Sequence, residues 1–193
     1  MRVIDFKVMP IDRDSARVLV EKYHYSKSLN GVMSRFCFGL FCGNELIGAA
    51  VYAGLGMANA WKKYADNPDD VIELRRLVCV DEAPKNSESR LVGMSLRWLR
   101  QNTDIKKVVS YADPNHGHQG IIYKATNFKY LGLTSSGKVI EYQGKQWHDK
   151  AIRTKYNGKL KPFAVKLKQA LENGDAVYRK TQGKHIYVFD LNH

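Results

Sequence analysis

Tyr111-Ala-Asp-Pro-Asn-His-Gly-His-Gln-Gly120 is the stretch that decides the fold of this chain. Residues 107–111 before it are short and rich in β-formers, which predicts a buried strand. Four apolar residues after it recur at helical spacing: Ile121, Ile122, Ala125 and Phe128. Gly132 then lies where a left-handed helix stop is expected. An aspartate, two histidines and two glycines therefore lie between the end of a strand and the start of a helix. Ligands of α/β proteins commonly bind at such a position.

The sequence on either side of this stretch alternates between strand and helix patterns. Strands are expected over residues 3–10, 36–42, 46–52 and 71–80, and helices over residues 12–23, 59–64 and 87–102. Beyond residue 132 the pattern predicts short strands over residues 139–142, 151–156 and 186–189, and a basic helix over residues 161–171. This order predicts an α/β fold of three layers with a mixed sheet.

The length and composition are those of a folded protein with one domain over residues 1–193. Of its 193 residues, 44% are hydrophobic and 26% are charged. No apolar run approaches the roughly 20 residues that span a bilayer, so no membrane partner is expected. Cys37, Cys42 and Cys79 lie in apolar, strand-like runs, which indicates reduced thiols in a cytoplasmic protein.

The charge is concentrated near the carboxyl end of the chain. The net charge is +12, and residues 124–193 hold 14 Lys or Arg against 5 Asp or Glu, which makes residues 133–193 a basic C-terminal portion. A nucleic acid is the leading partner, because lysine and arginine release counterions from phosphates; a basic surface that only keeps the protein soluble is the alternative. The lysines expected to contact the nucleic acid are Lys124, Lys155, Lys159 and Lys161.

The order of elements resembles the acyltransferase fold of the GNAT superfamily, whose sheet is mainly antiparallel. Ile122-Tyr-Lys-Ala-Thr-Asn-Phe128 is similar to the Leu-Tyr-x-x-x-Gly-Phe segment of that family, with Asn127 in the glycine place. The resemblance implies that Tyr123 is a general acid for a departing thiolate, although core packing also explains an aromatic residue here. It also implies that Arg90 and Gly93 bind the pyrophosphate of an acyl-CoA donor, while Ser95 replaces the second small residue of that turn.

A second resemblance covers roughly residues 20–132 and is closer. Four motifs in the right order are similar to the phage Mom family: His24-Tyr25, Glu73-Leu-Arg-Arg-Leu77, Tyr111-Ala-Asp-Pro114 with Gly117-His-Gln-Gly120, and Tyr123-Lys-Ala125. This resemblance implies a divergent GNAT-like enzyme that places a carbamoylmethyl-type group on the exocyclic nitrogen of adenine in DNA, inside the bacterial host cell. The modified base protects phage DNA from restriction enzymes.

The resemblance gives Asp113, His24, Tyr25 and Arg75 roles in catalysis. Asp113 would orient the base amine or bind a metal, although capping a loop is the usual role of an Asp-Pro pair. His24 and Tyr25 would act as a proton acceptor and as a donor or stacking platform, whereas helix capping and packing are the structural alternative. Arg75 and Arg76 are adjacent on a strand, so we expect opposite faces, with Arg75 binding a phosphate or carboxylate.

Two histidines and a tyrosine complete the expected site. His116 and His118 would contact a DNA phosphate or a metal, or simply make the loop polar. Iron would suit a set made of His24, Tyr25, Asp113 and His118, but the spacing does not establish it. Tyr111 would line an aromatic pocket with Tyr25 and Tyr123, because adenine must leave the duplex before its amine is reached.

The sequence thus favours a DNA adenine-modifying transferase that acts on double-stranded DNA with the target base flipped out. The sequence does not identify the small molecule that donates the transferred group. The alternatives are a GNAT N-acyltransferase that modifies a protein or a small amine with acyl-CoA, and a noncatalytic nucleic-acid-binding module.

Overall fold

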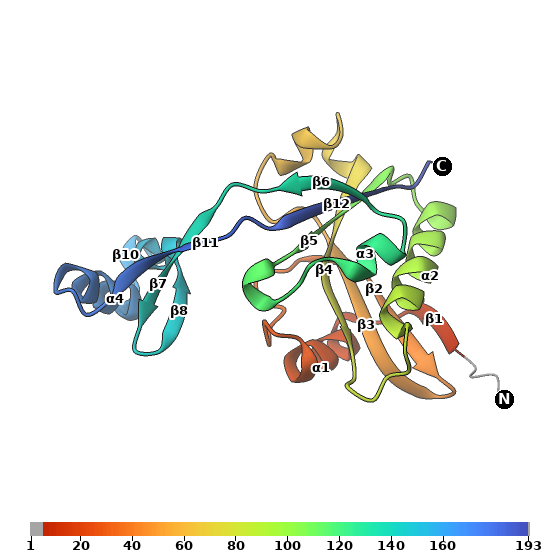
Figure 1. Cartoon of the computed structure of the whole chain (residues 1–193), viewed down its shortest axis with the longest axis horizontal. Coiled ribbons are helices and arrows are strands. Elements are labelled where there is room, and N and C mark those ends of the chain that lie inside the picture. The colour runs from red at the N-terminus through yellow and green to blue at the C-terminus, as the bar shows by residue number, and fades with distance from the viewer. Residues whose placement is uncertain (1–5, 193) are drawn as a thin grey trace. The chain divides into compact units, whose positions relative to one another are not determined.

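The computed structural model describes residues 6–192, so residues 3–5 of the first expected strand lie outside the described part. The chain divides into two compact units (Figure 1). Met1–Gly132 together with His185–His193 form the first, and Leu133–Lys184 form the second. A single domain over residues 1–193 stays a prediction, but the last nine residues group with the first unit and not with the basic portion that precedes them.

A sheet of seven strands forms the centre of the first unit. Its order is β1-β2-β3-β4-β5-β12-β6. The strands are β1 (Phe6–Pro10), β2 (Ser34–Cys42), β3 (Glu45–Ala53), β4 (Val71–Cys79), β5 (Lys107–Ala112), β6 (Lys129–Leu133) and β12 (His185–Asp190). β4 and β5 run parallel, whereas the pairs β1–β2, β2–β3, β3–β4 and β5–β12 are antiparallel.

Helices cover both faces of this sheet, which confirms the predicted three-layer α/β fold (Figure 1). α1 (Arg13–Tyr23) packs on one face, and α2 (Ser87–Asn102) and α3 (Ile121–Ala125) pack on the other. Asp12 caps α1 by accepting a hydrogen bond of 2.8 Å from the backbone N–H of Ser15, which contributes about 1 kcal/mol. Short 3-10 turns complete the unit: η1 (Ala60–Lys63), η2 (Pro68–Asp70) and η3 (Pro114–His116).

The helix after the deciding stretch is shorter than its apolar spacing predicts. α3 ends at Ala125, and Asn127, not Gly132, is the next residue in the left-handed region, with φ 64°. Asparagine tolerates this conformation better than most residues, which explains its presence in the glycine place. The chain then turns, Phe128 enters the core, and β6 begins at Lys129.

The second unit has its own small core. A sheet of order β11-β7-β8 contains β7 (Gly137–Tyr142), β8 (Lys145–His148) and β11 (Val177–Thr181). Ile140 packs with Leu167 and Ala170 of α4 (Pro162–Glu172). The strand predicted over residues 151–156 is wrong: Asp149–Arg153 form the 3-10 turn η4, and only Lys155–Tyr156 (β9) pair with Lys159–Leu160 (β10).

The two ends of the second unit meet. The N–H of Thr134 donates to the carbonyl of Lys184 at 2.9 Å, and the N–H of Lys184 donates to Oγ1 of Thr134, also at 2.9 Å. The segment between β6 and β12 therefore begins and ends at neighbouring positions. Across residues 6–192, no helix is long and apolar enough to cross a membrane.

Candidate active site

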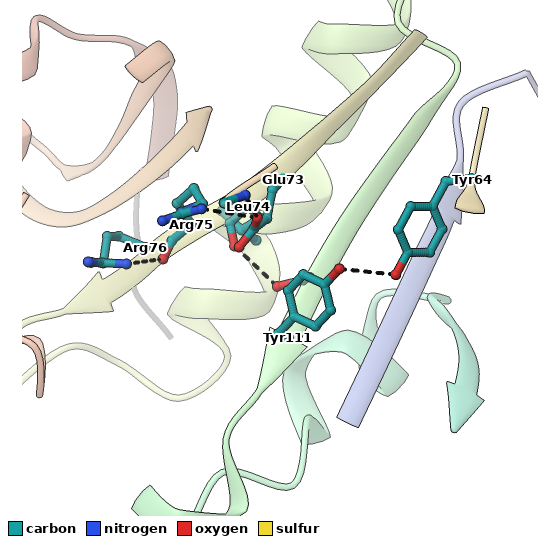
Figure 2. A network of polar contacts seen from close by, with 8 residues as sticks. Tyr64, Glu73, Leu74, Arg75, Arg76 and Tyr111 are labelled. Carbon is teal, nitrogen blue, oxygen red and sulfur yellow. Dashed lines mark hydrogen bonds and ion pairs between the residues drawn. The ribbon is translucent and has the colours of Figure 1, made fainter. Parts of the chain in front are cut away.

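The site lies where the two parallel strands of the sheet separate. β4 and β5 pair only from Val71–Lys107 to Glu73–Val109. Beyond that level one contact remains, from Oγ of Ser110 to the carbonyl of Leu74 at 3.3 Å, and the two strands run apart (Figure 2). Beyond Glu73 and Val109 the two strands are therefore no longer paired with each other.

A β-bulge at Arg75 places two arginines on one face of the sheet. Across the β3–β4 pair Tyr52 lies opposite Leu74 and Val51 lies opposite Arg76, so Arg75 is an extra residue without a partner. The alternation of β4 shifts by one residue there: Leu74 packs on the α2 side, and Val78 packs on the α1 side. The prediction that Arg75 and Arg76 point to opposite faces is therefore wrong, because a bulge re-aims the side chains that follow it.

Arg75 is held by a carboxylate on its own strand. Its Nη1 lies 3.3 Å from Oε2 of Glu73, and both side chains are largely buried, at 19% and 12% exposure (Figure 2). The same Oε2 accepts a hydrogen bond of 3.0 Å from the backbone N–H of Gly56. A Cβ at Gly56 would lie 2.1 Å from Nη1 of Arg75, so a larger residue there would have to displace this guanidinium.

Arg76 faces α1 and the loop that follows it. Its Nε donates to the carbonyl of Ser28 at 3.2 Å, and its Nη1 donates to the carbonyl of Arg75 at 2.8 Å. Burial lowers the pKa of Arg76 from its usual value, although a guanidinium stays charged at any physiological pH. This positive charge also acts on His24.

His24 ends α1 as its C-cap and is buried, with 8% exposure. Burial, followed by the charge of Arg76, lowers its pKa to about 4, so the ring is neutral at pH 7. Its Nδ1 accepts the backbone N–H of Ser26 at 3.1 Å, so the proton of the neutral ring resides on Nε2. His24 is therefore arranged as a hydrogen-bond donor and not as the expected proton acceptor.

The ring of Tyr25 contacts three histidine rings. Its ring stacks on His116, with centroids 4.4 Å apart, and lies 4.3 Å from His24 and 5.3 Å from His118. The contacts join the end of α1 to the loop after β5. Tyr25 is 48% exposed, so the three histidines leave about half of this residue accessible.

Asp113 organises the loop that carries His116 and His118. Its side chain is buried at 8% exposure and accepts hydrogen bonds from the backbone N–H of Asn115 at 3.0 Å and from Nδ2 of Asn115 at 2.8 Å. Its carbonyl accepts the N–H groups of His116 and His118. Asp113 thus has the capping role of an Asp-Pro pair and lies next to the Tyr25 cluster.

Tyr123 reaches the opening from α3. Its hydroxyl hydrogen-bonds to Ser110, and burial raises its pKa, so the phenol is protonated at pH 7. Its ring packs 5.3 Å from Tyr187, whose hydroxyl donates to the carbonyl of Gln119 at 2.7 Å. Ser110 and Tyr187 were missed by the sequence analysis, because neither lies in a recognisable motif.

Tyr111 lies on the opposite face of β5 from Ser110, since side chains alternate along a strand. Its hydroxyl is 3.0 Å from that of Tyr64, a residue that the sequence analysis also missed (Figure 2). Burial raises the pKa of Tyr111 well above its usual value. Tyr25, Tyr111 and Tyr123 therefore do not form one aromatic wall; Tyr111 packs with Tyr64 instead.

Arg90 and Gly93 lie along α2 and not around a turn. The N–H of Arg90 is already bonded to the carbonyl of Asn86 at 3.0 Å, and its guanidinium lies 4.6 Å from the ring of Phe6. Gly93 is exposed with open space around it, and Ser95 is buried with Oγ 2.6 Å from the hydroxyl of Tyr52. These residues do not form a pyrophosphate-binding turn, and the first turn of α2 carries the acidic Glu88.

The set suggested for iron does not form a cluster of metal ligands. Within residues 6–192, no three His, Cys, Asp or Glu side chains are placed to hold a metal ion. Nδ1 of His24 is engaged by Ser26, and both the side chain and the carbonyl of Asp113 accept loop N–H groups.

The predicted DNA-binding lysines lie in two places. Lys124 is exposed on α3 of the first unit. Lys155, Lys159 and Lys161 lie on or beside the β9–β10 hairpin of the second unit, and Nζ of Lys161 lies 6.0 Å from the ring of Tyr156. Tyr156 is 69% exposed. Between Asp149 and Glu172 the chain has seven Lys or Arg and no acidic residue, so this surface is strongly positive.

Two solved acetyltransferases have the same fold as this chain. One from Bacillus subtilis in complex with CoA has a TM-score of 0.52 at 12% identity, covering 97% of this chain and 99% of that one. An N-acetyltransferase from Staphylococcus aureus Mu50 has a TM-score of 0.54 at 14% identity, covering 98% and 99%. The predicted GNAT-like fold is confirmed by these similarities.

Sequence comparison is more specific. Methylcarbamoylase mom of Escherichia phage Mu is 29% identical over 137 residues, which cover 69% of this chain and 56% of that protein. The chain thus matches little more than half of the length of that relative. The profile of the Mom protein family matches residues 5–193, nearly the whole chain, and the chain therefore belongs to the Mom protein family.

Proposed function

We propose that this protein is a DNA modification transferase that attaches a carbamoylmethyl-type group to the exocyclic N6 of adenine. The proposal is supported by membership of the Mom family and by the name of the phage Mu relative, a methylcarbamoylase. The observation that carries it is the half-exposed ring of Tyr25, held by His116 beside the separated ends of β4 and β5. A planar base can stack on such a ring once it leaves the duplex.

The chain's own residues supply positions for the reacting groups. The flipped adenine stacks on Tyr25, and its N6 amine donates a hydrogen bond to the carboxylate of Asp113. As the bond between N6 and the transferred carbon forms, the amine proton passes to Asp113. The bond from the donor to its leaving group breaks, and Tyr123, which is protonated at pH 7, gives its proton to that group. Most of the acceleration comes from proximity and orientation.

The second unit holds the DNA backbone in this proposal. Its residues 133–184 contain 12 Lys or Arg and 4 Asp or Glu, a surplus of 8. Lys155, Lys159 and Lys161 contact phosphates of double-stranded DNA, with Lys124 doing so from the first unit. Modified adenines then no longer fit the restriction enzymes of the bacterial host.

Mass spectrometry of nucleosides from the DNA of expressing cells tests the proposal. We expect a deoxyadenosine with added mass that is absent when Asp113→Ala is expressed. Unmodified DNA, combined with tight acyl-CoA binding and acylation of a protein or small amine, would instead establish the N-acyltransferase that the shared fold also allows. DNA binding without any covalent product would establish a binding module.

A further inference from the structure

The two arginines of the β4 bulge differ in what neutralises them. Arg75 has the carboxylate of Glu73 at 3.3 Å. Arg76 has only two carbonyl oxygens, those of Ser28 and Arg75. Of the ion pairs formed within residues 6–192, none includes Arg76. The bulge therefore brings a second positive charge to this face without a carboxylate of its own.

The position of Arg76 makes that charge costly. Its side chain is half-buried, and removing an ion from water is unfavourable unless an opposite charge accompanies it. The two carbonyls engage Nε and Nη1, while Nη2 has no partner within the described part of the chain. A planar guanidinium offers paired donors that match an oxyanion. The N–H groups of Nη2 are therefore available to bind an oxyanion.

The groups around Arg76 are suited to an anion. The electrostatic neighbours of Arg76 are His24, Tyr25, Arg75 and the carboxylate of Glu73, and Arg75 adds a second positive charge beside it. Glu73 is nearby but is engaged with Arg75 and with the N–H of Gly56.

We propose that Arg76, beside His24 and Tyr25, binds an oxyanion of a substrate, a carboxylate or a phosphate, and that Arg75 is the residue that supports the bulge. The oxyanion belongs either to the group donor or to a DNA phosphate next to the flipped base. Only this choice of source rests on the proposed function. Arg76 thus takes the anion-binding role that the family resemblance implies for Arg75.

Anion binding can be measured without any modification reaction. The full-length protein is labelled with [13C]histidine, His24 is assigned by the signal that disappears in His24→Gln, and phosphate or acetate is titrated at constant ionic strength. We expect a saturable shift of the His24 signal and a rise in its pKa, because the bound anion offsets the charge of Arg76. Arg76→Gln should lose this response, and Arg75→Gln should retain it.

Three results would overturn the proposal: no saturation in the wild-type protein, the same response in Arg76→Gln, or loss in Arg75→Gln alone. If Arg76→Gln does not fold, Arg76→Lys keeps the charge without the planar fork and should bind the anion about tenfold more weakly. Unchanged binding in Arg76→Lys would also contradict a guanidinium site.

A DNA-binding experiment then identifies the source of the oxyanion. The affinity of a short duplex is measured against salt for the wild-type protein and Arg76→Gln. A slope of log affinity against log salt that falls by about 0.9 assigns a DNA phosphate, whereas an unchanged slope with lost acetate binding assigns the donor. Failure of the anion site appears in the histidine titration, and failure of the proposed function appears in the nucleoside analysis.

Discussion

Tyr25 stacks on His116 with ring centroids 4.4 Å apart and planes 28° from parallel. The contact links two motifs that lie far apart in the sequence, one after α1 and one after β5. Each motif alone is ordinary loop chemistry, but together they form a supported aromatic platform beside the opening between β4 and β5.

The hydroxyl and the ring of Tyr25 can be separated by mutation. Tyr25→Phe keeps the stack on His116, whereas Tyr25→Ala loses it. If the hydroxyl takes part in proton transfer, Tyr25→Phe lowers modification by a factor of roughly 100 or more, measured as modified nucleoside per enzyme. If the ring only stacks the base, Tyr25→Phe retains activity and Tyr25→Ala loses it. A lower melting temperature with a small loss of activity would favour simple packing.

Asp113→Ala should abolish modification because the amine loses its proton acceptor. Since Asp113 also caps the loop through Asn115, Asp113→Asn is the matched control: its amide oxygen still accepts those hydrogen bonds but takes no proton. We expect both variants to be inactive and Asp113→Asn to melt close to the wild-type temperature. Full modification by either variant would remove Asp113 from the chemistry.

His24 should make stability depend on pH. Its pKa of about 4 is below the ordinary value near 6.5, so stability is complete above pH 6.5 and is lost as the pH falls toward 4. The unfolded chain binds the proton first, which costs about 2 kcal/mol by pH 4.5. His24→Gln should remove this dependence in urea unfolding at pH 7 and 4.5. His116→Gln, which removes an exposed histidine of the same cluster, should retain most of it.

Charge reversal on the second unit should weaken DNA binding. Replacing Lys155, Lys159 and Lys161 with glutamate is expected to lower duplex affinity and to reduce the slope of log affinity against log salt by about 0.9 for each lost phosphate contact. The control reverses three charges on the first unit, Arg17, Lys22 and Arg97. Equal losses in the two triple variants would mean that net charge matters and the hairpin does not.

Coenzyme A should bind weakly. Arg90, Gly93 and Ser95 lie along α2, and Ser95 is turned into the core against Tyr52, so they provide no turn of free amides. We expect calorimetry with coenzyme A and acetyl-CoA to give weak binding that changes little in Arg90→Ala. Tight binding that Arg90→Ala removes would show that the pyrophosphate is held there despite this geometry.

The sequence predicted most elements of the first unit because their hydrophobic periodicity is strong. α1, β2, β3 and α2 lie close to the residue ranges that the pattern predicts for them. Two failures have local causes. A pair of adjacent arginines does not indicate a β-bulge, so the bulge at Arg75 could not be predicted. α3 ends early because Asn127 adopts a left-handed conformation, which the spacing of the apolar residues does not indicate.

The site was predicted in part, since residues were identified but not their partners. The motifs found His24, Tyr25, His116 and His118, which the fold brings together. They could not show that Ser26 fixes the tautomer of His24, because that depends on the backbone after α1. They also could not show that Glu73 pairs with Arg75, because the bulge that sets the direction of Arg75 is not visible in the sequence.

The hydrogen bonds between Thr134 and Lys184 have an evolutionary consequence. An insertion whose two ends meet can be exchanged, enlarged or trimmed without moving the strands on either side of it. Leu133–Lys184 behaves as such an insertion between β6 and β12. The length and sequence of this segment can therefore change while the residues of the candidate site, which lie on both sides of it in the chain, keep their places.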